Sequence, residues 1–159
     1  MLIVSDTTPL HYLILLGKQD ILPILFAAVT IPHAVFQELN HENTPHEIKK
    51  WFSSPPRWLT VQTVSENSLI GIEGLGRGET EAIAIALERN VDALLLDDRR
   101  GIREAKKRDL SVLTTLEVLE LAAIKGLIDL QESIDALRKT TFFMPTDEVI
   151  QEMLKRNHG

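Results

Sequence analysis

The chain has 159 residues, a formal net charge of -6 and no cysteine. This length suits one domain with its own hydrophobic core, and the lack of cysteine excludes disulfide scaffolds, thiolate metal sites and cysteine nucleophiles. We recognise neither a signal peptide nor an apolar run of the roughly 20 residues that a membrane-spanning helix needs, and therefore expect a cytoplasmic protein.

Short apolar segments alternate with longer helical patterns along the chain. In chain order, the predicted elements are a strand at 2–4, helices at about 10–16 and 21–26, a strand at 29–31, helices at 32–39 and 45–52, a strand at 58–64, a helix at 79–89, a strand at 93–96, a helix at 99–108, a strand at 111–113, a helix from 114 or 115 to about 126, and two helices within 130–157. Thr7 or Thr8 is expected to cap the first helix, and the glycines of residues 71–78 predict a loop. This alternation predicts an α/β fold, with a parallel sheet covered by helices on both faces.

The sequence contains no internal repeat, and the Pro-Pro turn at residues 55–56 does not have the composition of a domain linker. We therefore predict a single domain over residues 1–159. Within it, residues 1–125 would form the core and residues 126–159 a C-terminal helical extension.

Carboxylates directly follow two of the predicted strands. Asp6 comes after the strand at 2–4, and Asp97 and Asp98 come after the strand at 93–96. In open α/β sheets, ligands bind beyond the carboxyl ends of the strands, where the strand order reverses, so these acids are expected to meet. Each has a simpler interpretation: Asp6 could cap the next helix, and one of Asp97 and Asp98 could cap the helix after them.

Two further acids lie on predicted helices. Glu79 begins the helix at 79–89, where the helix dipole favours a negative charge, and Glu38 lies near the end of the helix at 32–39. Taken singly, either could be an ordinary solvated residue. Taken with the other acids they predict a metal site, because clustered carboxylates repel one another unless a cation neutralises them. Oxygen ligands without cysteine favour Mg²⁺ or Mn²⁺ over zinc.

Four segments, in this order, resemble PIN-domain proteins. They are IVSDTTPL at 3–10, IPHAVFQEL at 31–39, GRGETEAIAIALE at 76–88 and ALLLDDRRGIREA at 93–105. The resemblance covers about residues 1–125 and is strongest to small prokaryotic PIN proteins. It implies a three-layer α/β/α sandwich whose central sheet is mainly parallel and has five strands.

The resemblance also implies a Mg²⁺- or Mn²⁺-dependent endoribonuclease. Asp6, Glu38 and Glu79 match the first three catalytic acids of the family, and either Asp97 or Asp98 matches the fourth. All but Glu38 are expected to ligate the cation. The hydroxyls of Thr7 and Thr8, beside Asp6, could bond a carboxylate or a water. Many small PIN proteins are toxins held by an antitoxin and form homodimers, so the implied partners are RNA, an antitoxin protein and a second copy of the chain.

A basic segment follows the last acids and could hold RNA phosphates. The candidate RNA contacts are Arg77, Arg99, Arg100 and Arg103, and Lys106, Lys107 and Arg108 continue the segment. The alternative is a solvated helix face with ordinary ion pairs, because Glu104 and Asp109 lie among these residues.

Three other functions compete with a nuclease. A dinucleotide-binding loop is disfavoured, because Glu79 stands where the G-x-G-x-x-G pattern needs its last glycine. A metal-dependent phosphatase could use Asp6 as its nucleophile, but Thr8 replaces the second acid of an Asp-x-Asp motif. A catalytically weak or inactive PIN-like protein that only binds a partner is the third alternative.

Overall fold

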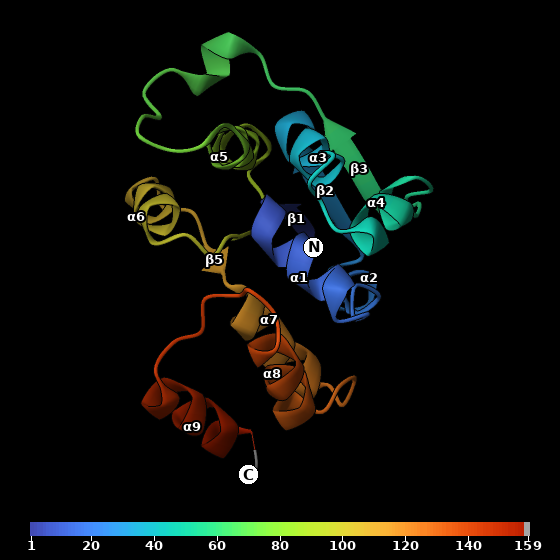
Figure 1. Cartoon of the computed structure of the whole chain (residues 1–159). Coiled ribbons are helices and arrows are strands. Elements are labelled where there is room, and N and C mark those ends of the chain that lie inside the picture. Colours follow the sequence, from blue (N-terminus) through green and yellow to red (C-terminus); the bar gives the residue numbers. More distant parts are fainter. Residues whose placement is uncertain (158–159) are drawn as a thin grey trace. The chain divides into compact units, whose positions relative to one another are not determined.

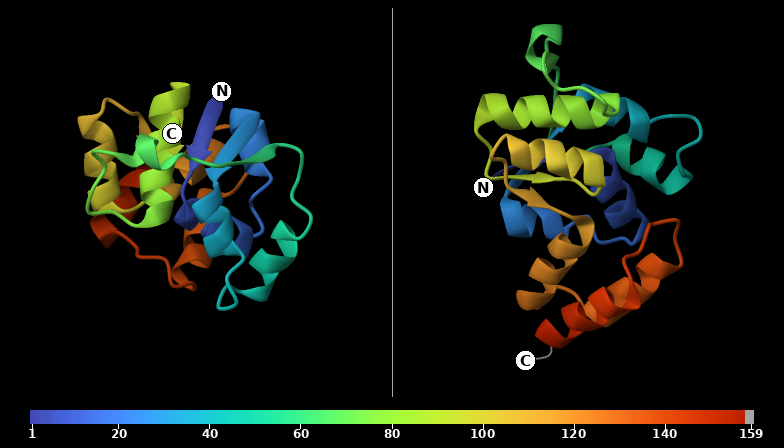
Figure 2. Two further views of the ribbon diagram at one scale, coloured as in Figure 1. Left: turned by 90° about the horizontal axis from the view of Figure 1, so that it is seen from above. Right: turned by 90° about the vertical axis from the view of Figure 1, so that its left-hand side faces the viewer.

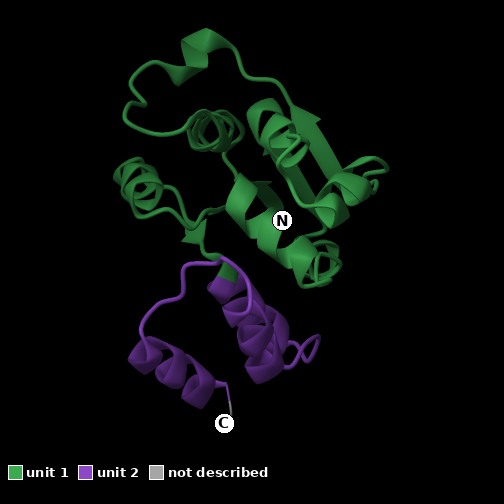
Figure 3. Ribbon diagram, viewed as in Figure 1, with its two compact units in different colours: residues 1–115 green, residues 116–159 purple. Residues whose placement is uncertain are grey.

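The computed structural model describes residues 1–157, which form two compact units (Figure 3). The first unit is Met1–Thr115 and the second begins at Leu116. A single domain with a core reaching residue 125 stays a prediction. None of the helices in residues 1–157 is long and apolar enough to cross a membrane.

The first unit is built on a sheet of five described strands, all parallel, in the order β3-β2-β1-β4-β5 (Figure 1). The strands are β1 (Leu2–Ser5), β2 (Ala28–Pro32), β3 (Leu59–Gln62), β4 (Ala93–Leu95) and β5 (Val112–Leu113). The central strands have almost no exposed side chains, as expected for a parallel sheet covered on both faces. The structure confirms the predicted α/β fold and its five-stranded sheet.

Helices connect the strands and cover the sheet. They are α1 (Thr7–Leu15), α2 (Ile21–Phe26), α3 (His33–Leu39), α4 (His46–Phe52), α5 (Arg77–Arg89) and α6 (Arg99–Lys107). Figure 2 shows α5 and α6 on one side of the sheet and the blue helices α1 and α2 on the other. This arrangement follows from right-handed crossovers, because the chain moves in one direction along the sheet from β1 to β2 and β3, and in the opposite direction from β3 to β4 and β5.

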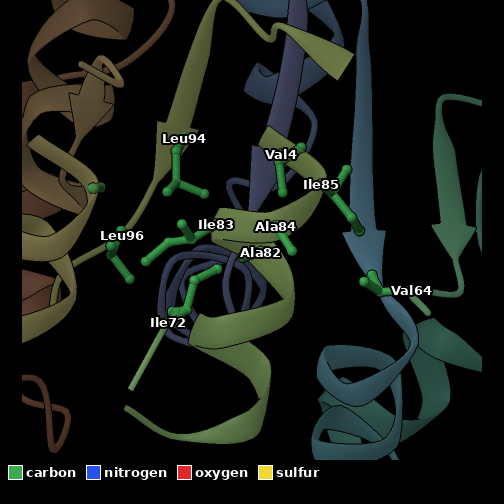
Figure 4. Close-up of a cluster of buried hydrophobic side chains, with 10 residues drawn as sticks. Val4, Val64, Ile72, Ala82, Ile83, Ala84, Ile85, Leu94 and Leu96 are labelled. Atoms are coloured by element: carbon green, nitrogen blue, oxygen red, sulfur yellow. The ribbon is translucent and has the colours of Figure 1, made fainter. Parts of the chain in front are cut away.

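The core beneath α5 explains why this helix is so rich in alanine and isoleucine. Ala82, Ile83, Ala84 and Ile85 are buried against strand residues that include Val4 and Leu94 (Figure 4). Small alanine side chains let the helix approach the sheet closely, while the isoleucines fill the remaining space. This packing fixes α5 against the sheet. It thereby also fixes the position of Glu79, which lies in the first turn of α5 directly after Gly78.

Two local expectations were wrong. The strand predicted at 58–64 is limited to Leu59–Gln62, and the loop after it contains a short 3₁₀ helix, η1 (Glu66–Leu69). Neither Thr7 nor Thr8 caps α1, because both lie inside the helix and Asp6 occupies the N-cap position. Such end positions depend on tertiary contacts that the local pattern does not contain.

The second unit consists of helices, as the sequence predicted for residues 130–157. Its elements are the greater part of α7 (Thr115–Ile124), α8 (Leu130–Arg138) and α9 (Asp147–Arg156). The side chain of Asp129 caps α8, and an ion pair joins Arg156 of α9 to Glu120 of α7 at 3.0 Å.

Candidate metal centre

Asp6 lies where the order of strands in the sheet reverses. β1 is flanked by β2 on one side and β4 on the other, and the backbone N–H of Asp6 donates to the carbonyl of Leu95 in β4. Asp6 occupies the N-cap position of α1, but its side chain makes no cap hydrogen bond. The carboxylate, only 5% exposed, is therefore not explained by helix capping.

The surroundings of Asp6 disfavour its charged form. The pKa of Asp6 is raised from 3.8 to about 7, chiefly by burial and in smaller part by the charges of Glu79, Glu38 and Asp97, against the lowering effect of a hydrogen bond with the Thr7 backbone. Three of the predicted site residues thus act on Asp6. They come from α5, from α3 and from the segment after β4, so the fold brings together acids that are far apart in the sequence.

Glu38 lies near the end of α3 and is held by α1. The hydroxyl of Thr7 donates a short hydrogen bond to Glu38 Oε2, as anticipated from the threonines beside Asp6. The hydroxyl of Thr44 donates to the backbone carbonyl of Glu38 at 2.9 Å, which fixes the end of the helix. The Glu38 carboxylate is consequently oriented by the residue that follows Asp6.

Glu79 carries an oxygen atom without a hydrogen-bond partner. Its Oε2 is enclosed and forms no hydrogen bond with any of residues 1–157. Burial, reinforced by the neighbouring Asp98 carboxylate and by Glu38, raises the pKa of Glu79 to about 7, while Arg100 lowers it. A buried polar atom that lacks a partner is uncommon in proteins, and a cation at this place would supply one.

Asp97 and Asp98 have different tasks in the structure. Asp98 is the N-cap of α6 and its Oδ2 accepts from the Gly101 N–H at 2.9 Å. Of the two aspartates that could have capped this helix, Asp98 is therefore the one that does. Asp97 is half-buried, and both of its carboxylate oxygens accept hydrogen bonds from Thr115. Asp97 acts on Asp6, whereas Asp98 acts on Glu79.

Two glycines leave space for these carboxylates. A Cβ atom on Gly78 would lie 2.9 Å from Glu38 Oε1 and 3.3 Å from Asp6 Oδ1. A Cβ atom on Gly101 would lie 2.9 Å from Glu79 Oε2. Both glycines lie in helices and neither has a positive φ, so the backbone conformation does not require glycine there. Glycine is required because the acids approach so closely. The sequence analysis missed both of them.

We expect Gly78→Ala to weaken cation binding much more than stability. The new methyl group would displace the carboxylates of Glu38 and Asp6, while alanine in a helix regains up to about 1 kcal/mol of the conformational cost of glycine. Mn²⁺ affinity, measured by titration followed by electron paramagnetic resonance, should fall about tenfold, in line with other changes that misplace metal ligands.

Gly76→Ala is the matched control for this prediction. Its Cβ would meet only Glu79 Oε1, at an ordinary contact distance of 3.7 Å. Equal Mn²⁺ affinities for the two variants would show that the space beside Gly78 does not matter to the site.

Glu81 is a buried acid that the sequence analysis also missed. Its Oε1 accepts from the backbone N–H of Ala34, at the start of α3, and its Oε2 accepts from Arg77 Nε at 2.6 Å. Glu81 thereby joins α5 to the helix that carries Glu38. Its spacing from Glu79 in the Gly-Glu-x-Glu block was the only available signal, and that spacing does not distinguish a structural acid from a ligand.

The four candidate RNA contacts have different surroundings. Arg77 is bound by Glu66 and Glu81, both at 2.6 Å, and this pairing raises its pKa. Arg99, Arg100 and Arg103 are exposed on α6 and form no ion pair within residues 1–157. Arg100 lies closest to the acids, because its charge acts on Glu79. The positive charge available to an anion therefore belongs to α6.

The donor chemistry of this region fits a hard divalent cation. The groups that approach one another are all carboxylates, one of their oxygens has no partner, and Gly78 and Gly101 leave room beside them. Among residues 1–157, no three His, Asp or Glu side chains are placed so that they could hold a metal ion together as they stand. Asp6, Glu79 and Asp97 are the residues that would hold the cation, with Glu38 and Asp98 adjoining them.

Comparison with known proteins identifies the family from the sequence. The family model DUF3368, described as a PIN domain, matches residues 2–158. No curated protein matches the chain.

A solved structure supports the same fold. The PilT N-terminus domain protein SSO1118 from the archaeon Sulfolobus solfataricus P2 is similar over 91% of this chain and 100% of its own, with a TM-score of 0.51. The two sequences are 14% identical, so this similarity concerns the fold alone.

Proposed function

Because the chain belongs to the PIN-domain family, whose members are generally nucleases, we propose that it is a Mg²⁺- or Mn²⁺-dependent endoribonuclease. The observation that carries the proposal is the environment of Asp6. A buried carboxylate with a pKa of about 7, surrounded by the charges of Glu79, Glu38 and Asp97, is costly without a cation and is explained by one.

The residues of the site would have different roles in hydrolysis. A bound divalent cation would supply Lewis acidity for a water molecule and for the phosphate. Asp6, Asp97 and Glu79 would hold it, and the Glu79 carboxylate, whose Oε2 has no partner within residues 1–157, would also take the proton of the attacking water. The water oxygen forms a bond to phosphorus as the bond to the leaving oxygen breaks, and the leaving oxygen gains a proton from solvent water.

Glu79→Gln is the direct test of this proposal. The amide cannot accept the proton of the water and is a weaker cation ligand, so we expect cleavage of a fluorescent single-stranded RNA in Mn²⁺ to fall by about 10²-fold or more. The fold should persist, as measured by circular dichroism. Addition of EDTA should abolish cleavage by the parent protein.

Glu47→Gln is the matched control, because Glu47 is exposed in the first turn of α4 and makes no side-chain hydrogen bond within residues 1–157. Parental cleavage by both variants would contradict the proposed site. A protein that binds Mn²⁺ but cleaves neither RNA nor phosphomonoesters would instead be the partner-binding alternative, and cleavage of phosphomonoesters alone would favour the phosphatase.

We assign the RNA contact to α6. Arg99 and Arg103 are one helical turn apart and exposed, so one phosphate backbone can meet both. The Arg99→Ala/Arg103→Ala variant should bind RNA about tenfold more weakly in Ca²⁺, with the slope of affinity against salt reduced by about 2.

The control for the RNA contact removes two other positive charges. Lys50 lies in the last turn of α4 and Arg57 precedes β3, so both belong to the opposite, amino-terminal edge of the sheet. Lys50→Ala/Arg57→Ala should leave RNA affinity nearly unchanged. If the two double variants lost affinity equally, net charge alone would explain binding.

The resemblance to small prokaryotic PIN proteins supports a finer proposal, in which this nuclease is a toxin controlled by an antitoxin and forms a homodimer. A toxin should arrest growth when expressed alone, and Glu79→Gln should relieve that arrest. Light scattering after size-exclusion chromatography measures the oligomeric state, and a monomer at all concentrations would remove the homodimer from the proposal.

A further inference from the structure

Thr115 binds both oxygens of the Asp97 carboxylate. Its backbone N–H donates to Oδ1 at 2.9 Å and its hydroxyl donates to Oδ2 at 2.5 Å. The parallel register of β4 and β5 explains the contact. Leu95 is level with Leu113, so Asp97 and Thr115, each two residues further on, leave the sheet side by side.

This pair of hydrogen bonds fixes the plane of the Asp97 carboxylate. Thr115 is fully buried and begins α7, so neither donor is free to follow a moving side chain. Each carboxylate oxygen has two lone pairs, so one hydrogen bond from Thr115 does not exhaust the acceptor capacity of either oxygen. Asp97 is thus oriented while remaining able to bind a cation beside Asp6.

Asp98 has no comparable arrangement. It is exposed, it caps α6 through the Gly101 N–H, and the acid on which it acts is Glu79. The position of Asp98 is explained by the helix end that it caps, whereas the plane of the Asp97 carboxylate is set by two hydrogen bonds from Thr115.

We propose that Thr115 is a positioning residue that holds Asp97, and not Asp98, as a ligand of the cation. The inference rests on the proposed metal-dependent function, because it specifies how one ligand of that site is oriented. The Thr115 side chain itself touches neither cation nor RNA and acts through the Asp97 carboxylate.

Thr115→Val tests the role of the hydroxyl, because valine has nearly the same shape and keeps the backbone N–H. Mn²⁺ affinity of the full chain, measured by electron paramagnetic resonance, should fall by about 10- to 100-fold, the usual effect of removing a hydrogen bond to a metal ligand. Thr115→Ser, which keeps the hydroxyl, should restore affinity to near the parental value. A purely structural role would not be rescued in this way.

Thr30→Val is the matched control for the buried threonine. Thr30 is also buried, but its hydroxyl accepts from Arg89 and forms no hydrogen bond with the acids of the site within residues 1–157. Its Mn²⁺ affinity should equal that of the parent. Parental affinity for Thr115→Val, or equal losses for Thr115→Val and Thr30→Val, would overturn the assignment.

A second comparison leaves Thr115 unchanged and so does not depend on the stability of its variants. Asp97→Asn should lose Mn²⁺ affinity, whereas Asp98→Asn should keep near-parental affinity, and its fold should persist because asparagine caps a helix as well as aspartate does. Greater loss of affinity in Asp98→Asn would overturn the inference. Asp6→Asn distinguishes a failure of the proposed role of Thr115 from a failure of the proposed metal-dependent function. Unchanged Mn²⁺ binding in Asp6→Asn would contradict the function itself.

Discussion

In EDTA at about pH 8, Asp6→Asn should unfold at a higher temperature than the parent protein while its Mn²⁺-dependent cleavage is lost. Asp6 is buried and its pKa is raised to about 7, so in the folded parent it is ionised at this pH at a considerable cost. Asparagine has nearly the same shape without the charge. It also removes repulsion from Glu79, Glu38 and Asp97.

The expected gain in stability is on the order of 2 kcal/mol, which corresponds to a rise of about 4–8 °C in Tm for a chain of this size. Cleavage should fall on the order of 10³-fold, because the substitution removes a ligand and with it the stabilisation of charge on the phosphate. A mutation that stabilises a protein and abolishes its activity indicates a residue kept for function.

Mn²⁺ provides the decisive comparison for Asp6. A cation at 100 times its Kd adds about 2.7 kcal/mol to the stability of the protein that binds it, so the parent should become the more stable of the two. Asp20→Asn is the control, since Asp20 is exposed and its side chain makes no cap hydrogen bond at α2. A lower Tm for Asp6→Asn in EDTA, or equal stabilisation of both proteins by Mn²⁺, would contradict the metal assignment.

The metal-free protein should lose stability as the pH rises from about 5 to 7. The pKa values of Asp6 and Glu79 are both raised to about 7 in the folded protein, from 3.8 and 4.5 in the unfolded chain. Across this interval the folded state binds more protons than the unfolded state, so each step up in pH favours unfolding; above about pH 7 the effect is complete.

Other titratable groups also make the stability depend on pH, and they act mainly at lower pH or in the opposite direction. The pKa values of Glu66, Glu104 and Glu120 are lowered by hydrogen bonds with arginine side chains, so their stabilisation is lost only as the pH falls below about 4.5. Burial lowers the pKa of His11, which makes folding less favourable as the pH falls through 6.5 and opposes the trend.

Urea unfolding in EDTA measures the pH dependence, and Asp6→Asn/Glu79→Gln isolates its source. The double variant retains His11 and the other glutamates, so the difference in unfolding free energy between parent and variant reports Asp6 and Glu79 alone. That difference should grow from about pH 5 to 7 and then level off. In saturating Mn²⁺ the parent should show the opposite trend, because its ligands must lose protons before they bind. A constant difference in EDTA would show that neither acid has a raised pKa.

The sequence by itself determined the fold class and the acids that gather in the structure. Short apolar strands alternating with helices can bury their side chains only as a covered parallel sheet, which the structure confirms. Asp6 and Asp97 directly follow strands, and the carboxyl ends of parallel strands share one edge. The order of elements along the chain is therefore enough to predict that these two acids approach each other.

Only the tertiary structure decided what each acid does. Asp97 and Asp98 are adjacent in the sequence with the same chemistry, and they are distinguished by the Gly101 N–H that Asp98 accepts and by Thr115, which meets Asp97 through the register of two strands. Likewise, the need for glycine at residue 78 arises from Glu38 and Asp6, which are distant along the chain. Local patterns encode helices, strands and the residues that follow them, but a hydrogen bond or a close approach between distant residues depends on how whole elements pack.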